Sequence, residues 1–219
     1  MIQDFGWGSL QFLFLGLLWT AGLAFITFIA GGILGMLFAL GRTLGPACIR
    51  IPIKIYIELI QATPLLIVVF LAYYGLSFLG LYLPPLAAAA ISMTVYATAF
   101  LADIWRGCIE AVPKGQWEAA DSLGLSGSER LRYVILPQAL RIAVGPTVGF
   151  MVQIVKNTSV TALIGFVELT RAGTLLNNMT FQPFHVFMSV AAMYFIVCYP
   201  LSWWSEKLKE RRHANSAAN

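Results

Sequence analysis

Residues 118–137 read EAADSLGLSGSERLRYVILP and form a polar, charged block within a very apolar chain. The whole chain is 59% hydrophobic and 11% charged, whereas an average soluble domain carries about 25% charged residues. This apolar excess is too large for the core of a 219-residue protein to hide, so the sequence predicts an all-α integral membrane protein. A long polar block on such a protein indicates a surface on which a soluble partner docks.

Stretches without Asp, Glu, Lys or Arg mark the expected membrane spans. They run from Asp4 to Arg42, from Glu58 to Asp103 and from Arg171 to Glu206, and a helical span needs about 20 apolar residues. The middle stretch can hold two spans joined at Pro84-Pro85, and another apolar segment begins at Pro137. The sequence therefore predicts one transmembrane domain, 1–219, with spans at roughly 10–40, 63–82, 85–106, 137–156 and 184–205 and a polar loop at 107–136.

Basic residues gather on one side of this topology. Five spans place the loops 42–54 and 106–141 and the C-terminal tail together, with 12 Lys and Arg, whereas the other side holds only Lys156 and Arg171. Basic residues favour the cytoplasmic side of a membrane. We therefore expect a cytoplasmic polar loop and C-terminus and an external N-terminus. The bilayer accounts for the basic residues, and no nucleic-acid partner is expected.

The first part of the polar loop predicts a short helix. Pro113 suits the first turn of a helix, and Gly124 suits a left-handed stop, which gives a helix over 114–123. Small alanines at 119 and 120 would let a partner surface approach its backbone, while Trp117 and Leu123 would supply apolar contact.

The second part of the loop predicts another helix. Ser126 and Glu129 have the spacing of a capping box. We expect a helix that lies on the bundle and ends where Pro137 opens the next span. Arg130 and Arg132 are expected to face water or lipid headgroups.

The first expected span carries Gly31 and Gly35. Two small residues at this spacing allow a second helix to approach closely. Glycine is also common in membrane helices without such a role, so both explanations stay open.

The sequence lacks the residues that are characteristic of other classes of membrane protein. The three cysteines, Cys48, Cys108 and Cys198, are far apart, and the sequence shows no metal-ligand spacing, nucleophile–base set or phosphate-binding loop. An integral membrane enzyme is therefore not expected. An ATP-independent channel or secondary carrier is the alternative, but it would need ionisable residues inside its spans. Only Asp103 and Arg141 qualify, and both lie near expected cytoplasmic ends.

The polar loop resembles the signature of one transporter family. Glu118-Ala119-Ala120, three residues, Gly124, nine residues, Val134, one residue and Leu136-Pro137 match the pattern of membrane permeases of binding-protein-dependent ABC importers, with valine where the family has isoleucine. Similar blocks of the polar-amino-acid branch occur at 63–66, 103–107, 111–116, 136–139 and 156–159. Asn157 stands where that branch often has aspartate, and Gln61-Ala62 where it often has Arg-Gly.

The resemblance implies a five-transmembrane-helix ABC importer permease core of type I with a cytoplasmic coupling helix. It implies a bacterial inner membrane location, with the N-terminus periplasmic. The implied partners are a second permease subunit, an ABC ATPase dimer that binds the ATP, and a periplasmic amino-acid-binding protein. This chain would hold no cofactor and catalyse no reaction. The residues implied in ATPase coupling are Lys114, Gly115, Trp117, Glu118, Ala119, Ala120, Leu123 and Gly124.

Polar residues after the fourth expected span are candidates for cargo binding. A zwitterionic amino acid inside a membrane cavity must exchange its water for protein partners. The candidates are Asn157, Thr158, Ser159, Thr161 and Glu168. Alternatives stay open: the threonine and serine hydroxyls can bond their own backbone, and Glu168 can pair with Arg171. Lys156 can bind cargo or extend to the lipid headgroups.

Overall fold

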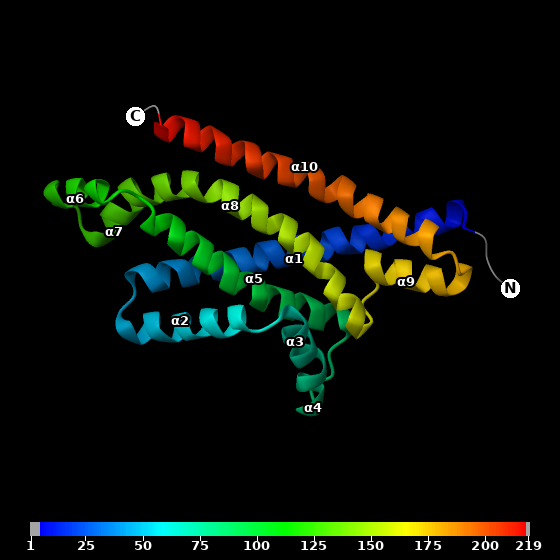
Figure 1. The fold of residues 1–219 in the computed structure, drawn as a ribbon. Helices are drawn as coiled ribbons and strands as arrows, with labels where there is room; N and C mark the ends of the chain where they lie inside the picture. The colour runs from blue at the N-terminus through cyan, green and yellow to red at the C-terminus, as the bar shows by residue number, and fades with distance from the viewer. Residues whose placement is uncertain (1–4, 218–219) are drawn as a thin grey trace.

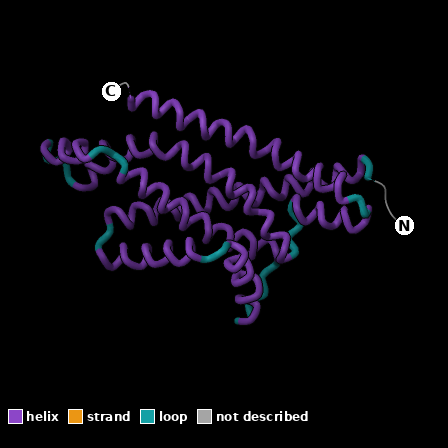
Figure 2. The backbone as a smooth tube through the Cα atoms, viewed as in Figure 1, coloured by secondary structure: helices purple, strands orange, loops and turns teal. Residues whose placement is uncertain are grey.

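The computed structural model describes the backbone of residues 5–217 and the side chains of residues 5–208, and this part of the chain contains helices and no strand. Figure 2 shows the helices joined by short loops. The helices are α1 (Trp7–Leu44), α2 (Ala47–Ala62), α3 (Leu65–Phe70), η1 (Leu71–Gly75), α4 (Leu76–Phe78), α5 (Pro85–Glu110), α6 (Lys114–Ser122), α7 (Gly127–Glu129), η2 (Arg130–Ile135), α8 (Leu136–Asn157), η3 (Thr158–Ile164), α9 (Leu169–Thr180) and α10 (Pro183–Ala217).

Four continuous helical stretches within the described residues are long and apolar enough to cross a membrane, and a bent pair of helices passes the same test together, which gives up to five candidate spans. The continuous ones are Trp7–Leu44, Pro85–Glu110, Gly127–Ile164 and Pro183–Leu208. The segment expected as a span at 63–82 contains the second helix of this pair. Residues 65–78 form a short apolar helix that meets α2 at 107°, so the chain bends sharply where this segment begins. Pro64 causes the break, because proline disfavours helical geometry at Thr63, whose backbone is extended.

The helix expected after Ser126 is present, but it does not end before Pro137, because it is continuous with the following span. Helical structure runs without interruption from Gly127 to Ile164. The segment η2 is a wide π-helical turn placed just before Pro137. Such a turn changes the hydrogen-bond partners of the backbone, so the chain passes the missing proline N–H without ending the helix.

Gly31 and Gly35 lie where α1 packs on α5. A Cβ atom added at Gly31 would lie 2.7 Å from Ala97 Cβ, and one added at Gly35 would lie 3.0 Å from Leu101 Cβ. Side chains larger than hydrogen would force the two helices apart. Of the two explanations left open by the sequence, the structure therefore supports close helix packing.

The two polar regions of the sequence lie at opposite ends of the bundle. Figure 1 shows α6 and α7 at one end, together with the C-terminal end of α10. The short helix α9 lies at the other end, where it packs against α1 near the N-terminus. The bundle therefore separates the expected docking helix from the segment that follows the expected cargo residues.

Candidate functional site

The helix α6 presents most of the predicted docking residues to solvent. Glu118 and Ala119 are exposed, and Leu123 at its C-terminal end is 77% exposed. Lys114, Gly115 and Gly124 are exposed as well. Ala120 is buried at 1% exposure, so this small residue faces the bundle rather than a partner. The helix therefore has an outer face available for docking and an inner face fixed to its own chain.

Trp117 also contributes to the inner face. Its ring is half-buried against the apolar cluster of Ile109, Val112, Leu131 and Ile135. The sequence suggested apolar contact with a partner for Trp117 and Leu123 alike. In the structure Leu123 alone of this pair is largely exposed, while Trp117 anchors α6.

Arg130 fastens α6 to the start of the fourth long span. Its guanidinium forms an ion pair with Asp121 and lies 5.4 Å from the centre of the Trp117 ring. Gln138 Nε2 adds a hydrogen bond to Gln116 Oε1 at 3.0 Å. Arg130 was expected to face water or headgroups, and its side chain, 26% exposed, is instead directed toward Asp121 and Trp117. No helical periodicity joins Arg130 to Asp121, because a glycine turn separates the two residues.

Replacing Arg130 with alanine is expected to loosen α6, because it removes the ion pair and the cation–π contact together. Backbone amides of residues 116–122 should exchange with deuterium several-fold faster, as measured by hydrogen exchange and mass spectrometry. Arg132→Ala is the matched control, since Arg132 lies beside Tyr133 and, among the described side chains, forms no ion pair or hydrogen bond with α6. Equal exchange in both variants would contradict the role assigned to Arg130.

The turn after α6 has the geometry that the sequence predicted. Gly124 has φ +70°, its N–H donates to Asp121 O at 2.9 Å, and Leu125 N donates to Ala120 O at 3.3 Å. These bonds form a Schellman stop. The next helical segment starts with the predicted capping box, in which Glu129 Oε2 accepts from Ser126 N at 2.9 Å.

Two of the predicted cargo residues are partly exposed, although the Ser159 hydroxyl donates to Lys156 O at 2.7 Å and Asn157 Nδ2 is buried, and the neighbouring threonines are fully buried. Asn157 and Ser159 are partly exposed. Thr158 and Thr161 are fully buried, and their hydroxyls donate to Val155 O at 2.8 Å and to Thr158 O at 2.6 Å. In this conformation the threonines bond their own backbone and cannot reach a cargo molecule.

Glu168 is sealed inside the protein as the N-cap of α9. Its carboxylate accepts hydrogen bonds from Thr170 N at 2.9 Å, Arg171 N at 2.8 Å, the Tyr194 hydroxyl at 2.8 Å and the Thr20 hydroxyl at 3.4 Å. Burial raises the pKa of the Glu168 carboxyl despite these four bonds. The predicted direct contact with cargo is not available here, because Glu168 is 0% exposed. The predicted pairing with the Arg171 side chain is replaced by a bond to the Arg171 backbone.

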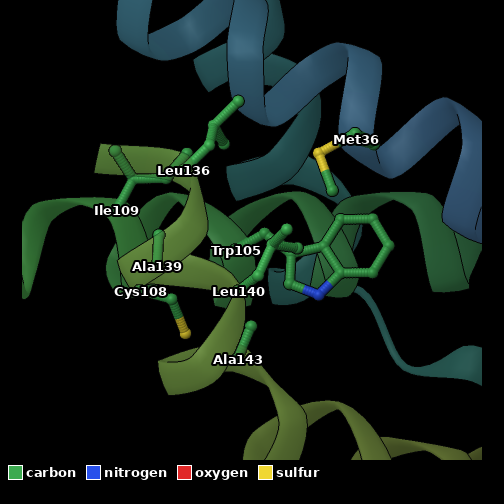
Figure 3. Close-up of a pocket in the computed structure, with 8 residues that line it drawn as sticks. All are labelled: Met36, Trp105, Cys108, Ile109, Leu136, Ala139, Leu140 and Ala143. Carbon is green, nitrogen blue, oxygen red and sulfur yellow. The ribbon is translucent and has the colours of Figure 1, made fainter. Parts of the chain in front are cut away.

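A small cavity lies where α1, α5 and α8 meet near α6. Figure 3 shows it between Met36 of α1, Trp105 of α5 and Leu136 of α8. Its volume is about 10 Å³ and its lining is almost entirely apolar. It has room for one water molecule at most and offers that molecule few partners, so it is a packing defect rather than a ligand site.

Comparison with known proteins identifies the family of the chain. Residues 31–213 match the family described as binding-protein-dependent transport system inner membrane component. The probable amino-acid ABC transporter permease protein YckA of Bacillus subtilis (strain 168) is 32% identical over 87% of this chain and 84% of its own length. The glutamine transport system permease protein GlnP of Escherichia coli (strain K12) is 32% identical over 94% of each chain.

Solved structures share the fold. One described as an amino acid ABC transporter with histidines is 31% identical, with a TM-score of 0.87 over 92% of this chain and 94% of that chain. The inward-facing MetNI methionine ABC transporter has a TM-score of 0.80 at 18% identity, over 93% and 97% of the two chains. The second likeness concerns the fold alone.

Proposed function

The chain belongs to the family of binding-protein-dependent transport system inner membrane components, and on that premise we propose that its exposed helix α6 is the surface on which an ATPase drives transport. The chain is a transmembrane subunit of an ATP-driven importer of polar amino acids, a multi-pass protein of the inner membrane. It works with an ATPase and with a second permease subunit. Its relatives and fold favour this function over an ATP-independent channel or carrier.

The proposed docking surface consists of the outer face and the two ends of α6. Glu118 places a negative charge on this face, and Ala119 keeps it thin enough for close approach by a partner. Lys114, Gly115, Leu123 and Gly124 border the contact. Trp117 and Ala120 hold the helix from beneath. The exposed Glu118-Ala119 face is the observation that carries the proposal.

The contacts that hold α6 against η2 would allow a movement of α6 to be transmitted to the fourth span. Because Arg130 joins α6 to η2, and helical structure continues from there to Ile164, a displacement of α6 would move the fourth span as a rigid body. ATP would be bound and hydrolysed by the partner ATPase, with no cofactor on this chain. Closure of the ATPase pair would switch the permease outward, and hydrolysis would reset it.

The orientation of the chain in the membrane follows from the proposal that α6 is the docking helix. A docking helix must lie in the cytoplasm, and the C-terminal end of α10 lies at that end of the bundle (Figure 1). The N-terminus and α9 would then face the periplasm, where an amino-acid-binding protein would deliver cargo. Asn157 and Ser159 remain proposed cargo contacts, while Thr158, Thr161 and Glu168 would support them from within.

Uptake into reconstituted vesicles tests this function. The complete complex should import at least one of glutamate, glutamine, arginine and histidine, and only with ATP present. Omitting the ATPase is the matched control and should remove uptake. Import without the ATPase would overturn the proposal.

A further inference from the structure

A groove of about 440 Å³ lies between α8 and α10. Its wall on α10 is formed by Ala191, Tyr194, Phe195, Cys198, Tyr199 and Ser202, and its wall on α8 by Lys156. Lys156 is exposed, and it forms no ion pair with a carboxylate among the described side chains. The groove therefore combines a mostly apolar surface with one positive charge.

The groove lies at the middle of a span. The span of α10 runs from Pro183 to Leu208. At 1.5 Å per helical residue, the first lining residue lies about 12 Å from the start of this span and the last about 9 Å from its end. Lys156 is the penultimate residue of α8, and it lies beside the central turns of α10. Of the two roles that the sequence left open for Lys156, extension to the headgroups does not fit this depth.

A lysine at this depth requires a polar environment. Moving an ammonium group to the middle of a bilayer costs several kcal/mol, so ionisable residues there face a water-filled cavity or a partner charge. The groove is within the usual size range of small-molecule sites, roughly 300–1,000 Å³. Lipid phosphate groups stay at the membrane surface and would not reach it. The carboxylate of a molecule that is transported through the membrane would reach the groove.

We infer that Lys156 binds the α-carboxylate of the amino acid during its passage through this groove. The inference rests on the proposed function and adds a site to it. Every amino acid carries an α-carboxylate, so a fixed ammonium recognises the class of cargo without selecting a side chain. Tyr194 forms part of the same wall, and its hydroxyl is held by Glu168 at 2.8 Å. The buried Glu168 is thereby a positioning residue for the groove.

The test compares uptake with ATP hydrolysis in the reconstituted complex, with whichever amino acid of the four the wild type imports. Lys156→Met should lower the uptake rate about tenfold or more, the typical effect of losing a charge-assisted hydrogen bond, while ATP hydrolysis changes less than about twofold. Lys156→Arg should restore most of the uptake. Lys54→Met is the matched control, because Lys54 is an exposed lysine of α2 outside the groove.

The outcomes separate the two proposals. Unchanged uptake in Lys156→Met would overturn the inference. A parallel loss of uptake and ATP hydrolysis would overturn it as well, because that result is expected if Lys156 has only a structural role. If the wild-type complex imports none of the four amino acids, the proposed function fails instead.

A second measurement reports on the groove directly. Lys156→Cys, combined with Cys48→Ser and Cys198→Ala, should react with an anionic, membrane-impermeant methanethiosulfonate. The same chain with Lys156 retained gives the background from Cys108, which is buried. Absence of labelling above that background would contradict a water-accessible path at Lys156.

Discussion

Replacing Glu118 with arginine is expected to abolish ATP-driven uptake, with a loss of about 100-fold or more, because the reversed charge would be pressed against the ATPase surface. The Glu118 side chain is exposed and forms no hydrogen bond or ion pair within the described residues. The variant should therefore fold normally and lose only its partner. Co-purification of the ATPase and uptake into vesicles measure the two effects.

Glu206→Arg is the matched control for Glu118→Arg. It reverses the charge of another exposed glutamate, on α10, and should leave co-purification intact. A second pair of variants probes Gly124, around which a Cβ would meet no atom within 4 Å. Gly124→Asn tolerates the left-handed backbone and should retain docking, whereas Gly124→Trp should block it. Normal ATPase co-purification with Glu118→Arg would rule out α6 as the docking surface.

Replacing Glu168 with alanine is expected to destabilise the folded chain by roughly 3 kcal/mol or more, because several buried donors lose their acceptor at once. The donors come from α1, the start of α9 and α10, so the carboxylate joins three helices. The thermal unfolding temperature in detergent should fall, together with the yield of assembled complex. Thermal unfolding of the purified chain measures the first effect.

Glu129→Ala is the control for Glu168→Ala, because both carboxylates cap a helix N-terminus. Within the part of the chain that the structure describes, the Glu129 side chain bonds only Ser126, its partner in the capping box, and it lies at the surface. Its removal should change the unfolding temperature much less. Similar losses in the two variants would show that Glu168 acts as an ordinary cap and not as a link between helices.

The docking helix could be predicted from the sequence because its determinants are local. Pro113, Gly124 and the Ser126–Glu129 box each act within a few residues, and the structure has a helix, a left-handed stop and a capping box at these positions. The apolar stretches likewise predicted helices long enough to span a membrane. The bend at Pro64 was missed because the apolar run continues through it and hydrophobicity does not report helix direction.

The cargo region could not be predicted in the same way. Thr158, Thr161 and Glu168 are polar and follow a span, which is the pattern of a binding site, yet they are turned inward and bonded to their own chain. Periodicity gives the face of a helix on which a residue lies, but not the neighbour that covers it. For the same reason the sequence left open whether Lys156 binds cargo or extends to the headgroups.

The sequence by itself determined the helical membrane class, the family and the docking helix, since composition and short-range spacing encode hydrophobic burial, capping and turns. The tertiary structure alone decided which polar groups are sealed and which are open. It placed Arg130 against Trp117, Glu168 among three helices and Lys156 beside the middle of α10. These contacts join residues distant in sequence, and they depend on how whole helices cross and bend, which no local pattern records.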